Sequence, residues 1–376
     1  MKIIEKLLDA LNLEKMEQRR IAKAKNSAQP NDMELLLKIK AFWETHEYSY
    51  CSPESRQANR GEIYEYALTY ALSCFAKPRH SNEMSPFHLG SIGITNWPAF
   101  FSDISQNGYI RPAAAEEVLS TYTVKELKII ADSLGIKKSG KKMDLIDEIQ
   151  IFATDDMIDN ITSDSDLYIL ADKGAEYISS REDYVLLEKH AVCDISLSEF
   201  NDHRILCGRR RNFYDTMFQA LSDKAFKLNL CHCFDKLAIT ELHIYNILIE
   251  EATLTEHTPH IDVAIHHYLE YLYLLLCFSR DASFLTNEGV FYRDASGIRL
   301  PHINNNLIDF KDYFKYINYN VIFSNKPPCF LTDHEFITMV EEFLNTPIFD
   351  YDKWNLILQN RFSEYIKLFT KRMWRL

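Results

Sequence analysis

Glycine and proline are scarce in this chain of 376 residues, with 10 glycines and 11 prolines against 21 tyrosines and 23 phenylalanines. Because turn-forming residues are so few, a fold built from many short strands is disfavoured and long helices are expected. Hydrophobic residues make up 47% of the chain, which excludes disorder along its whole length. The sequence therefore predicts a mainly α, multi-helix chain, with at most a small β-hairpin in the region 290–300.

The chain also lacks an excess of basic residues. It has 42 lysines and arginines against 54 aspartates and glutamates, so its formal net charge is -12. A protein that is coated by nucleic acid usually has the opposite balance. Any binding to nucleic acid must therefore come from a local basic patch.

Long apolar runs and compact cysteine motifs are missing as well. The most apolar run, Tyr268 to Phe278, is interrupted by Glu270 and is far shorter than the roughly 20 residues that cross a bilayer. Acidic residues near the N-terminus argue against a signal peptide. The eight cysteines show no disulfide framework. We therefore expect a soluble, cytoplasmic protein with free thiols and no membrane contact.

Breaks in the pattern divide the chain into four regions. Proline and glycine cluster between residues 77 and 98, and aspartates cluster between 154 and 166. The predicted regions are an N-terminal helical region (1–98), a helix–loop–helix with a lead-in helix (99–152), an acidic linker with a short strand, turn and helix (153–190), and a helical C-terminal domain (191–376). Within them, a short strand is predicted at 168–170, and helices are predicted over 2–25, 176–190, 212–229, 234–252, 260–279, 306–319, 333–345 and 351–373. The helix at 333 follows a capping box formed by Thr332 and Glu335.

The region 118–150 has clear helix signals. Thr123 stands three residues before Glu126, which is the pattern of a capping box at a helix start. Gly135 is a natural helix stop, and Ser139-Gly140 is a natural turn. A second helix is predicted from Lys141 to about Phe152. The result is helix, turn and helix within about thirty residues.

These residues resemble a SAP module, a small helix–loop–helix domain of chromatin, DNA-repair and phage-encoded proteins. The resemblance covers less than a tenth of the chain, and the lead-in at 107–112 is similar to that of bacterial and prophage members. It rests on Tyr122 to Lys128, Leu134-Gly135, Lys138 to Lys142, Leu145-Ile146 and Ile149. It implies binding to DNA, often A/T-rich, or in some members to RNA.

A cluster of lysines could carry that binding. Lysines around a turn that leads into a helix N-terminus offer ammonium groups and free amides to a phosphate, and a glycine permits close approach. The predicted nucleic-acid-binding residues are Lys125, Lys128, Lys137, Lys138, Ser139, Gly140, Lys141 and Lys142. Asp147 and Glu148 stand where the family often has a basic residue, so the predicted affinity is weak.

Two further groups have weaker signals. Arg209, Arg210 and Arg211 are secondary candidates for phosphate contacts. Cys231-His232-Cys233 suggests zinc together with later histidines, including His243, His266 and His267. No second paired-ligand motif follows at structural-site spacing, so we predict neither a metal nor another cofactor.

Enzyme signatures are missing. The chain has no nucleophile elbow, no phosphate-binding glycine loop and no dinucleotide fingerprint. The predicted function is therefore that of a DNA-binding accessory or structural protein that contacts the phosphate backbone with weak sequence specificity. Two alternatives stay open: a protein-interaction scaffold, with a partner bound through the C-terminal helical domain, and an enzyme with an unrecognised site in that domain.

Overall fold

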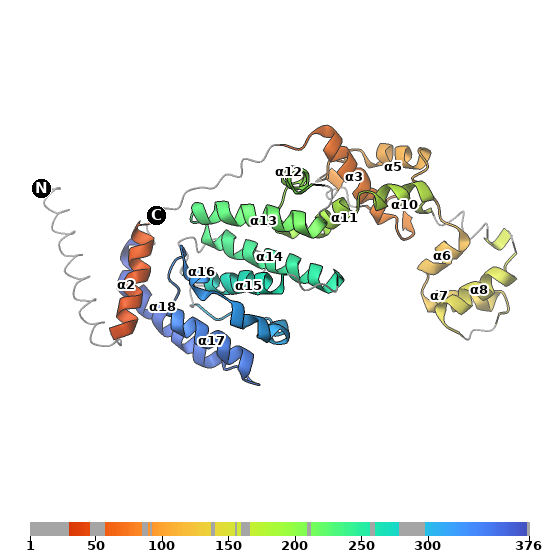
Figure 1. The fold of residues 1–376 in the computed structure, drawn as a ribbon. Coiled ribbons are helices and arrows are strands. Elements are labelled where there is room, and N and C mark those ends of the chain that lie inside the picture. Colours follow the sequence, from red (N-terminus) through yellow and green to blue (C-terminus); the bar gives the residue numbers. More distant parts are fainter. Residues whose placement is uncertain are drawn as a thin grey trace, which may run out of the picture. The chain divides into compact units, whose positions relative to one another are not determined.

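The protein is described by a computed structural model (Figure 1). The described residues are 30–45, 57–84, 89–90, 92–136, 140–154, 156–158, 166–208, 212–255, 260–277 and 298–373. They are mainly helical and include one small three-stranded sheet, which confirms the predicted fold class. None of the helices in this part of the chain is both long enough and apolar enough to cross a membrane.

The chain forms two compact units. Residues 55–201 make up the middle unit, and residues 1–54 with 202–376 make up the terminal unit. The sequence-based boundary at residue 98 does not coincide with this division. Helix α3 (Arg60–Cys74) and helix α5 (Trp97–Gln106) share one hydrophobic core, in which the rings of Phe75 and Trp97 stack with centroids 6.4 Å apart. The residues on either side of position 98 therefore belong to the same unit.

The middle unit alternates short helices with three short strands. After α3 and α5 its elements are β1 (Arg79–His80), β2 (Ile110–Pro112), α6 (Ala115–Thr121), α7 (Val124–Ser133), α8 (Lys142–Phe152), β3 (Leu167–Leu170), α10 (Asp172–Ser179), α11 (Glu182–Lys189) and the 3-10 turn η1 (Ala191–Cys193). A single helix was expected from Glu176 to His190. The structure has two helices there, because the chain turns at Ser180 and Arg181, where the Arg181 N–H donates to the Ile178 carbonyl at 2.7 Å.

The sheet has the strand order β1-β3-β2, and both pairings are antiparallel. The strand predicted at 168–170 is its central strand, β3. In the β2–β3 pairing, Ile110 lies opposite Leu170 and Pro112 lies opposite Tyr168. The two edge strands come from segments that were expected to be loop or lead-in, because strands of two or three residues leave no alternation to read.

The terminal unit contains the longer helices. Its elements are α2 (Pro30–Thr45), α13 (Phe213–Leu230), α14 (Phe234–Thr255), α15 (Ile261–Leu275), the 3-10 helix η2 (Asn305–Tyr316), α16 (Tyr319–Phe323), α17 (Asp333–Asn345) and α18 (Tyr351–Met373), and α12 (Leu197–Cys207) runs across the boundary between the units. Helices α14 and α15 lie side by side (Figure 1), and most of α15 is buried, including every residue from Tyr268 to Leu275. The region 306–319, expected as one α-helix, forms η2 and the start of α16.

Two of the predicted elements fall wholly or partly on residues that the structure does not describe. The helix expected over 2–25 lies outside the described residues. Of the hairpin expected near 290–300, only Ile298 to Leu300 are described, and they are not assigned to a strand.

Arg361 on α18 forms ion pairs with helices α2 and α17. Arg361 on α18 donates from Nε to Asp32 Oδ1 at 2.8 Å. It also donates from Nη1 to Glu335 Oε2 at 2.6 Å and from Nη2 to Glu335 Oε1 at 2.9 Å. A guanidinium that bridges two carboxylates in this way fixes the relative orientation of the helices that carry them.

Candidate nucleic-acid interface

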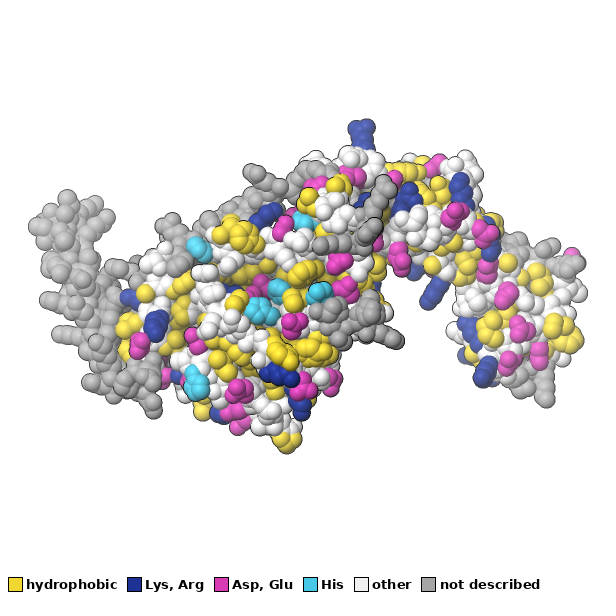
Figure 2. Space-filling model, in the orientation of Figure 1, with side chains coloured by type: hydrophobic (Ala, Val, Ile, Leu, Met, Phe, Trp, Pro, Cys, Tyr) yellow, Lys and Arg dark blue, Asp and Glu magenta, His cyan; other side chains and the backbone are white. Residues whose placement is uncertain are grey.

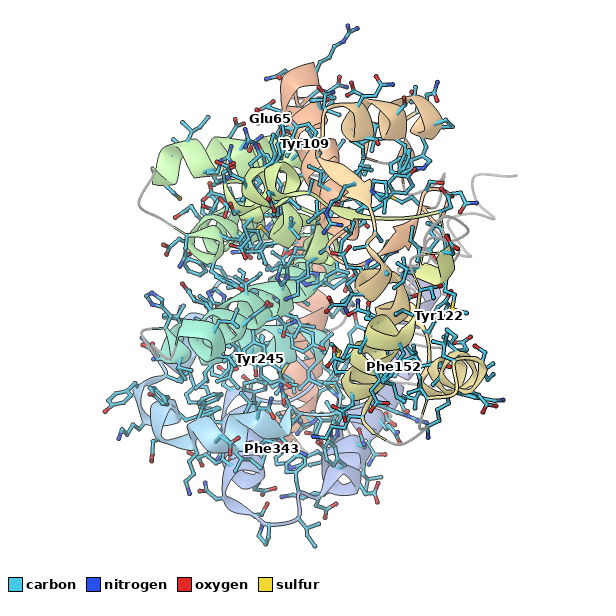
Figure 3. The ribbon with its side chains drawn as sticks, turned by 90° about the vertical axis from the view of Figure 1, so that its right-hand side faces the viewer. Glu65, Tyr109, Tyr122, Phe152, Tyr245 and Phe343 are labelled. Atoms are coloured by element: carbon cyan, nitrogen blue, oxygen red, sulfur yellow. The ribbon has the colours of Figure 1, made fainter. Side chains whose placement is uncertain are left out.

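Residues 115–152, which we call the lysine module, fold around a core of their own. Its members come from the three helices α6, α7 and α8, and each is fully enclosed: Leu119, Leu127, Ala131, Leu145, Ile146 and Ile149. Tyr122 packs against this core from the connection between α6 and α7 (Figure 3). Leu145, Ile146 and Ile149, on which the resemblance partly rests, thus belong to the core that holds the helix–loop–helix together.

Helix α7 begins at the capping box that the sequence predicts. The Thr123 hydroxyl oxygen accepts from the Glu126 N–H at 3.3 Å, and the Glu126 carboxylate accepts from the Thr123 N–H at 2.7 Å. These hydrogen bonds lower the pKa of the Glu126 carboxyl. The helix start is therefore satisfied by local side chains.

Gly135 ends α7, also as predicted. Its φ of +70° lies in the left-handed region, which a glycine adopts without steric cost. Its N–H donates to the Asp132 carbonyl at 3.1 Å, and the Ile136 N–H donates to the Ala131 carbonyl at 2.8 Å. These bonds satisfy the last carbonyls of the helix.

The start of α8 differs from the sequence-based picture of an open anion site. Lys141 is the N-cap residue, and its backbone N–H donates to Asp144 Oδ2 at 2.8 Å. Asp144 also crowds Gly140: a Cβ on that glycine would lie 3.0 Å from the Asp144 Cβ. A carboxylate of the chain itself therefore lies at the amide where a phosphate was expected.

The predicted lysines have different surroundings. Lys142 donates from Nζ to the Ser120 carbonyl at 2.6 Å, so its ammonium caps the C-terminal end of α6. Lys125, Lys128 and Lys141 are exposed, and none of them forms an ion pair with another described residue. Lys142 therefore has a structural contact, whereas the other three ammonium groups are available to a ligand.

Most of the remaining predicted site residues fall on undescribed positions. Lys137, Lys138 and Ser139 lie outside the described residues, and so do Arg209, Arg210 and Arg211. On the described surface of the lysine module, acidic and apolar side chains are interspersed with the lysines (Figure 2). Ile129, for example, which follows Lys128 on α7, is 63% exposed.

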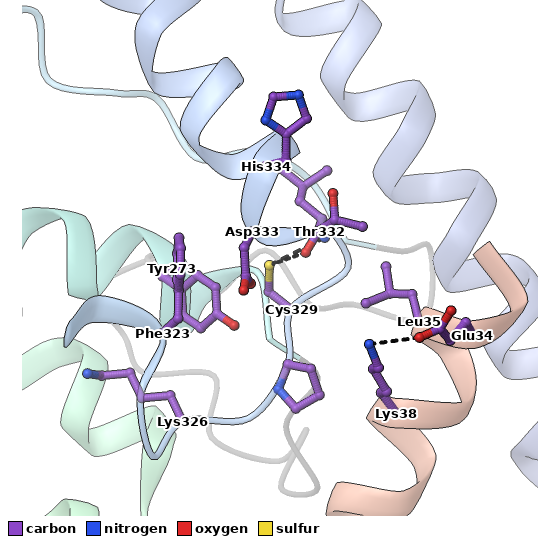
Figure 4. A pocket seen from close by; sticks show the side chains of 12 residues that line it. Glu34, Leu35, Lys38, Tyr273, Phe323, Lys326, Cys329, Thr332, Asp333 and His334 are labelled. Atoms are coloured by element: carbon purple, nitrogen blue, oxygen red, sulfur yellow. Dashed lines mark hydrogen bonds and ion pairs between the residues drawn. The ribbon is translucent and has the colours of Figure 1, made fainter. Parts of the chain in front are cut away.

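The terminal unit has a pocket, the feature expected of the enzyme alternative (Figure 4). Its volume is about 490 Å³, and its wall includes Tyr273, Lys326, Cys329 and Asp333. The Cys329 thiol is completely buried, and its burial raises its pKa to about 12. Burial likewise raises the pKa of the Tyr273 hydroxyl and of the Asp333 carboxyl. At neutral pH the thiol and the phenol stay protonated, so neither is an activated nucleophile.

The described side chains that could bind a metal ion together do not include Cys231 or Cys233, the cysteines that suggested zinc in the sequence. Among the described residues, the group whose ligand atoms lie within 4.8 Å of one another consists of Glu241, His267 and Glu270. Neither Cys231 nor Cys233 belongs to it. Only His267 of this group had been singled out, although Glu270 could have been found as the charged residue inside the most apolar run of the chain.

Comparisons of the chain with protein-family models, with curated proteins and with solved structures gave no match.

Proposed function

We propose that the protein binds DNA by its phosphate backbone through the lysine module, in an accessory or structural role. The resemblance to SAP modules supports this proposal over residues 118–150. The module has a core of its own, and six residues rich in lysine separate Gly135 from Lys142, the first residue of α8. The phosphate contacts position the module on a duplex without reading its sequence, so we expect weak sequence specificity.

The proposal depends on the exposure of three lysine ammonium groups that have no ion-pair partner among the described residues. Lys125 and Lys128 lie one turn apart on α7, and Lys141 stands at the first residue before α8. All three are exposed and have no ion-pair partner among the described residues. Each can therefore approach a phosphate without first breaking an internal ion pair, and each contact releases counterions from the DNA.

The expected affinity is low and depends on salt. With Lys137 and Lys138 of the turn, the module offers at most five phosphate contacts. The logarithm of the binding constant should then fall against the logarithm of salt concentration with a slope of about -3 to -4.5. Asp144, Asp147 and Glu148 on α8 oppose the approach of a polyanion, which keeps binding weak.

A fluorescence-anisotropy titration with a labelled duplex at about 50 mM and about 200 mM salt tests the proposal. The triple variant Lys125→Glu, Lys128→Glu, Lys141→Glu should lose at least about tenfold in affinity at the lower salt. The matched control carries the same charge change at exposed lysines elsewhere: Lys77→Glu, Lys311→Glu, Lys315→Glu. It should lose less than about twofold.

Equal losses in the two triple variants would show that net charge alone matters and would contradict an interface on the module. Absence of any duplex binding by the unchanged protein at low salt would also overturn the proposal and leave the protein-interaction and enzyme alternatives. A stem-loop RNA of matched length, titrated alongside, distinguishes a preference for RNA from one for DNA.

A further inference from the structure

Three ionisable side chains converge in the interior of the terminal unit. Glu241 comes from α14, and His267 and Glu270 come from α15, where a spacing of three residues places them on one helix face. Their side chains are 5%, 18% and 10% exposed. One ligand atom of each lies within 4.8 Å of the other two.

Each member of this cluster is held by a specific contact. His267 Nδ1 lies 2.5 Å from Glu241 Oε2. Glu270 Oε1 accepts from Lys326 Nζ at 2.8 Å and lies 3.2 Å from His266 Nε2. Glu270 is thus oriented by two outer partners, which is how metal-binding carboxylates are usually held.

The charge balance of the cluster is the central point. Two carboxylates in a low-dielectric interior repel each other, and buried charges persist when they are paired or bind a metal. Lys326 supplies one positive charge to Glu270. Glu241 has the His267 imidazole as its hydrogen-bond partner, and an imidazole is a metal ligand when it is neutral. A divalent cation between Glu241, His267 and Glu270 would offset the second carboxylate.

We propose that Glu241, His267 and Glu270 bind a divalent transition-metal ion such as Zn²⁺. One imidazole nitrogen and two carboxylate oxygens form a ligand set that suits zinc and leaves a coordination position open. Bonds of about 2.0 Å to a tetrahedral ion place ligand atoms about 3.3 Å apart. The contact between His267 Nδ1 and Glu241 Oε2, at 2.5 Å, must therefore open by about 1 Å when the ion binds.

One side chain contacts both the cluster and the pocket described above. Lys326 lines that pocket, and its Nζ donates to Glu270 Oε1 at 2.8 Å. This metal site is in the terminal unit and is independent of the lysine module. Neither proposal depends on the other.

The test uses the full-length, untagged chain, first dialysed against a chelator and then titrated with Co²⁺. The visible absorption of Co²⁺ reports its coordination, and thiolate ligands add a separate charge-transfer band. We expect one Co²⁺ per chain with nitrogen and oxygen ligation and no thiolate band. Glu241→Gln and His267→Asn should each weaken binding at least about a hundredfold.

His260→Asn is the matched control, because His260 stands exposed at the N-cap of the same helix. It should bind Co²⁺ as the unchanged protein does. The proposal is overturned if the unchanged protein binds no Co²⁺, if all three variants bind alike, or if a thiolate band accompanies binding. Since the unchanged protein alone can give the first and third results, the test stays decisive even if a variant folds poorly.

Discussion

The Asp144 carboxylate accepts the backbone N–H of Lys141 at 2.8 Å, so α8, the last helix of the lysine module, is capped by its own third residue. This contact stabilises the start of α8, because it satisfies an amide that has no partner within the helix. It also places a negative charge at the point where a phosphate would approach. Helix stability and anion binding therefore compete at the same amide.

Asp144→Asn should tighten DNA binding. The asparagine oxygen can still accept the Lys141 N–H, while the negative charge at the helix start is removed. We expect a gain in affinity of about two- to fivefold at low salt, measured by anisotropy. Asp147→Asn removes the same charge from an exposed position further along α8 and should have a smaller effect. A larger gain for Asp147→Asn would contradict the competition described above.

Adjacent lysines should have separable roles. The Lys142 ammonium donates to the Ser120 carbonyl, so Lys142→Met should lower the free energy of unfolding by about 0.5–1.5 kcal/mol. Lys141 has no such contact among the described residues, so Lys141→Met should weaken DNA binding and leave stability nearly unchanged. Thermal unfolding and anisotropy on both variants check this. The opposite pattern would show that the two ammonium groups have been assigned to the wrong roles.

Gly174 should tolerate no side chain. A Cβ at this position would lie 2.2 Å from the Tyr109 carbonyl oxygen and 2.8 Å from Leu170 Cδ2. We expect Gly174→Ala to destabilise the protein by about 1–3 kcal/mol, since the overlap outweighs the gain in helix propensity. Gly90→Ala is the control, because no atom lies within 4 Å of its added Cβ. Denaturant unfolding followed by circular dichroism should separate the two variants.

Acid should weaken the attachment of α17 to α18. Burial alone would raise the pKa of Glu335, but the hydrogen bonds from Arg361 and from the Thr332 N–H lower it below its ordinary value. A carboxyl whose pKa is lowered on folding contributes stability above its unfolded pKa of about 4.3, and this contribution is lost as the pH falls through the folded value.

Glu335→Gln should therefore cost about 1–2 kcal/mol at neutral pH and progressively less as the pH falls below about 4. Glutamine still accepts the Thr332 N–H, so the helix cap is kept. Unfolding by urea at a series of pH values measures the difference. Glu341→Gln, at an exposed position on the same helix, is the control and should show no such trend. A cost for Glu335→Gln that does not change with pH would contradict the assigned ion pair.

Local sequence signals predicted much of this fold. The capping boxes at Thr123 and Thr332 both form, and Gly135 ends its helix. These features depend on residues three or four positions apart, so their physical cause is contained in a short stretch of sequence. The helices with long apolar stripes, such as α13 and α15, were predicted for the same reason.

What the sequence did not predict depends on contacts between distant residues. β1 and β2 pair with a strand more than fifty residues away and are too short to show a pattern. The break at Ser180 and Arg181 has no glycine or proline to mark it. The contact of Lys142 with the Ser120 carbonyl was not predicted, because the two residues are 22 positions apart in the sequence. Glu241 has an ordinary sequence context, and only its helix partner reveals it as part of a cluster.

The lysine module is inserted between two paired strands, β2 and β3. Pro112 and Tyr168 are cross-strand neighbours, and the Ala113 N–H donates to the Leu167 carbonyl at 2.8 Å, so residues 114–166 leave the sheet and return to almost the same point. A segment whose two ends meet in this way can be removed and its ends joined by a tight turn, with the strand pairing preserved. For the same reason, the segment could be inserted into another protein in place of the turn of an antiparallel hairpin.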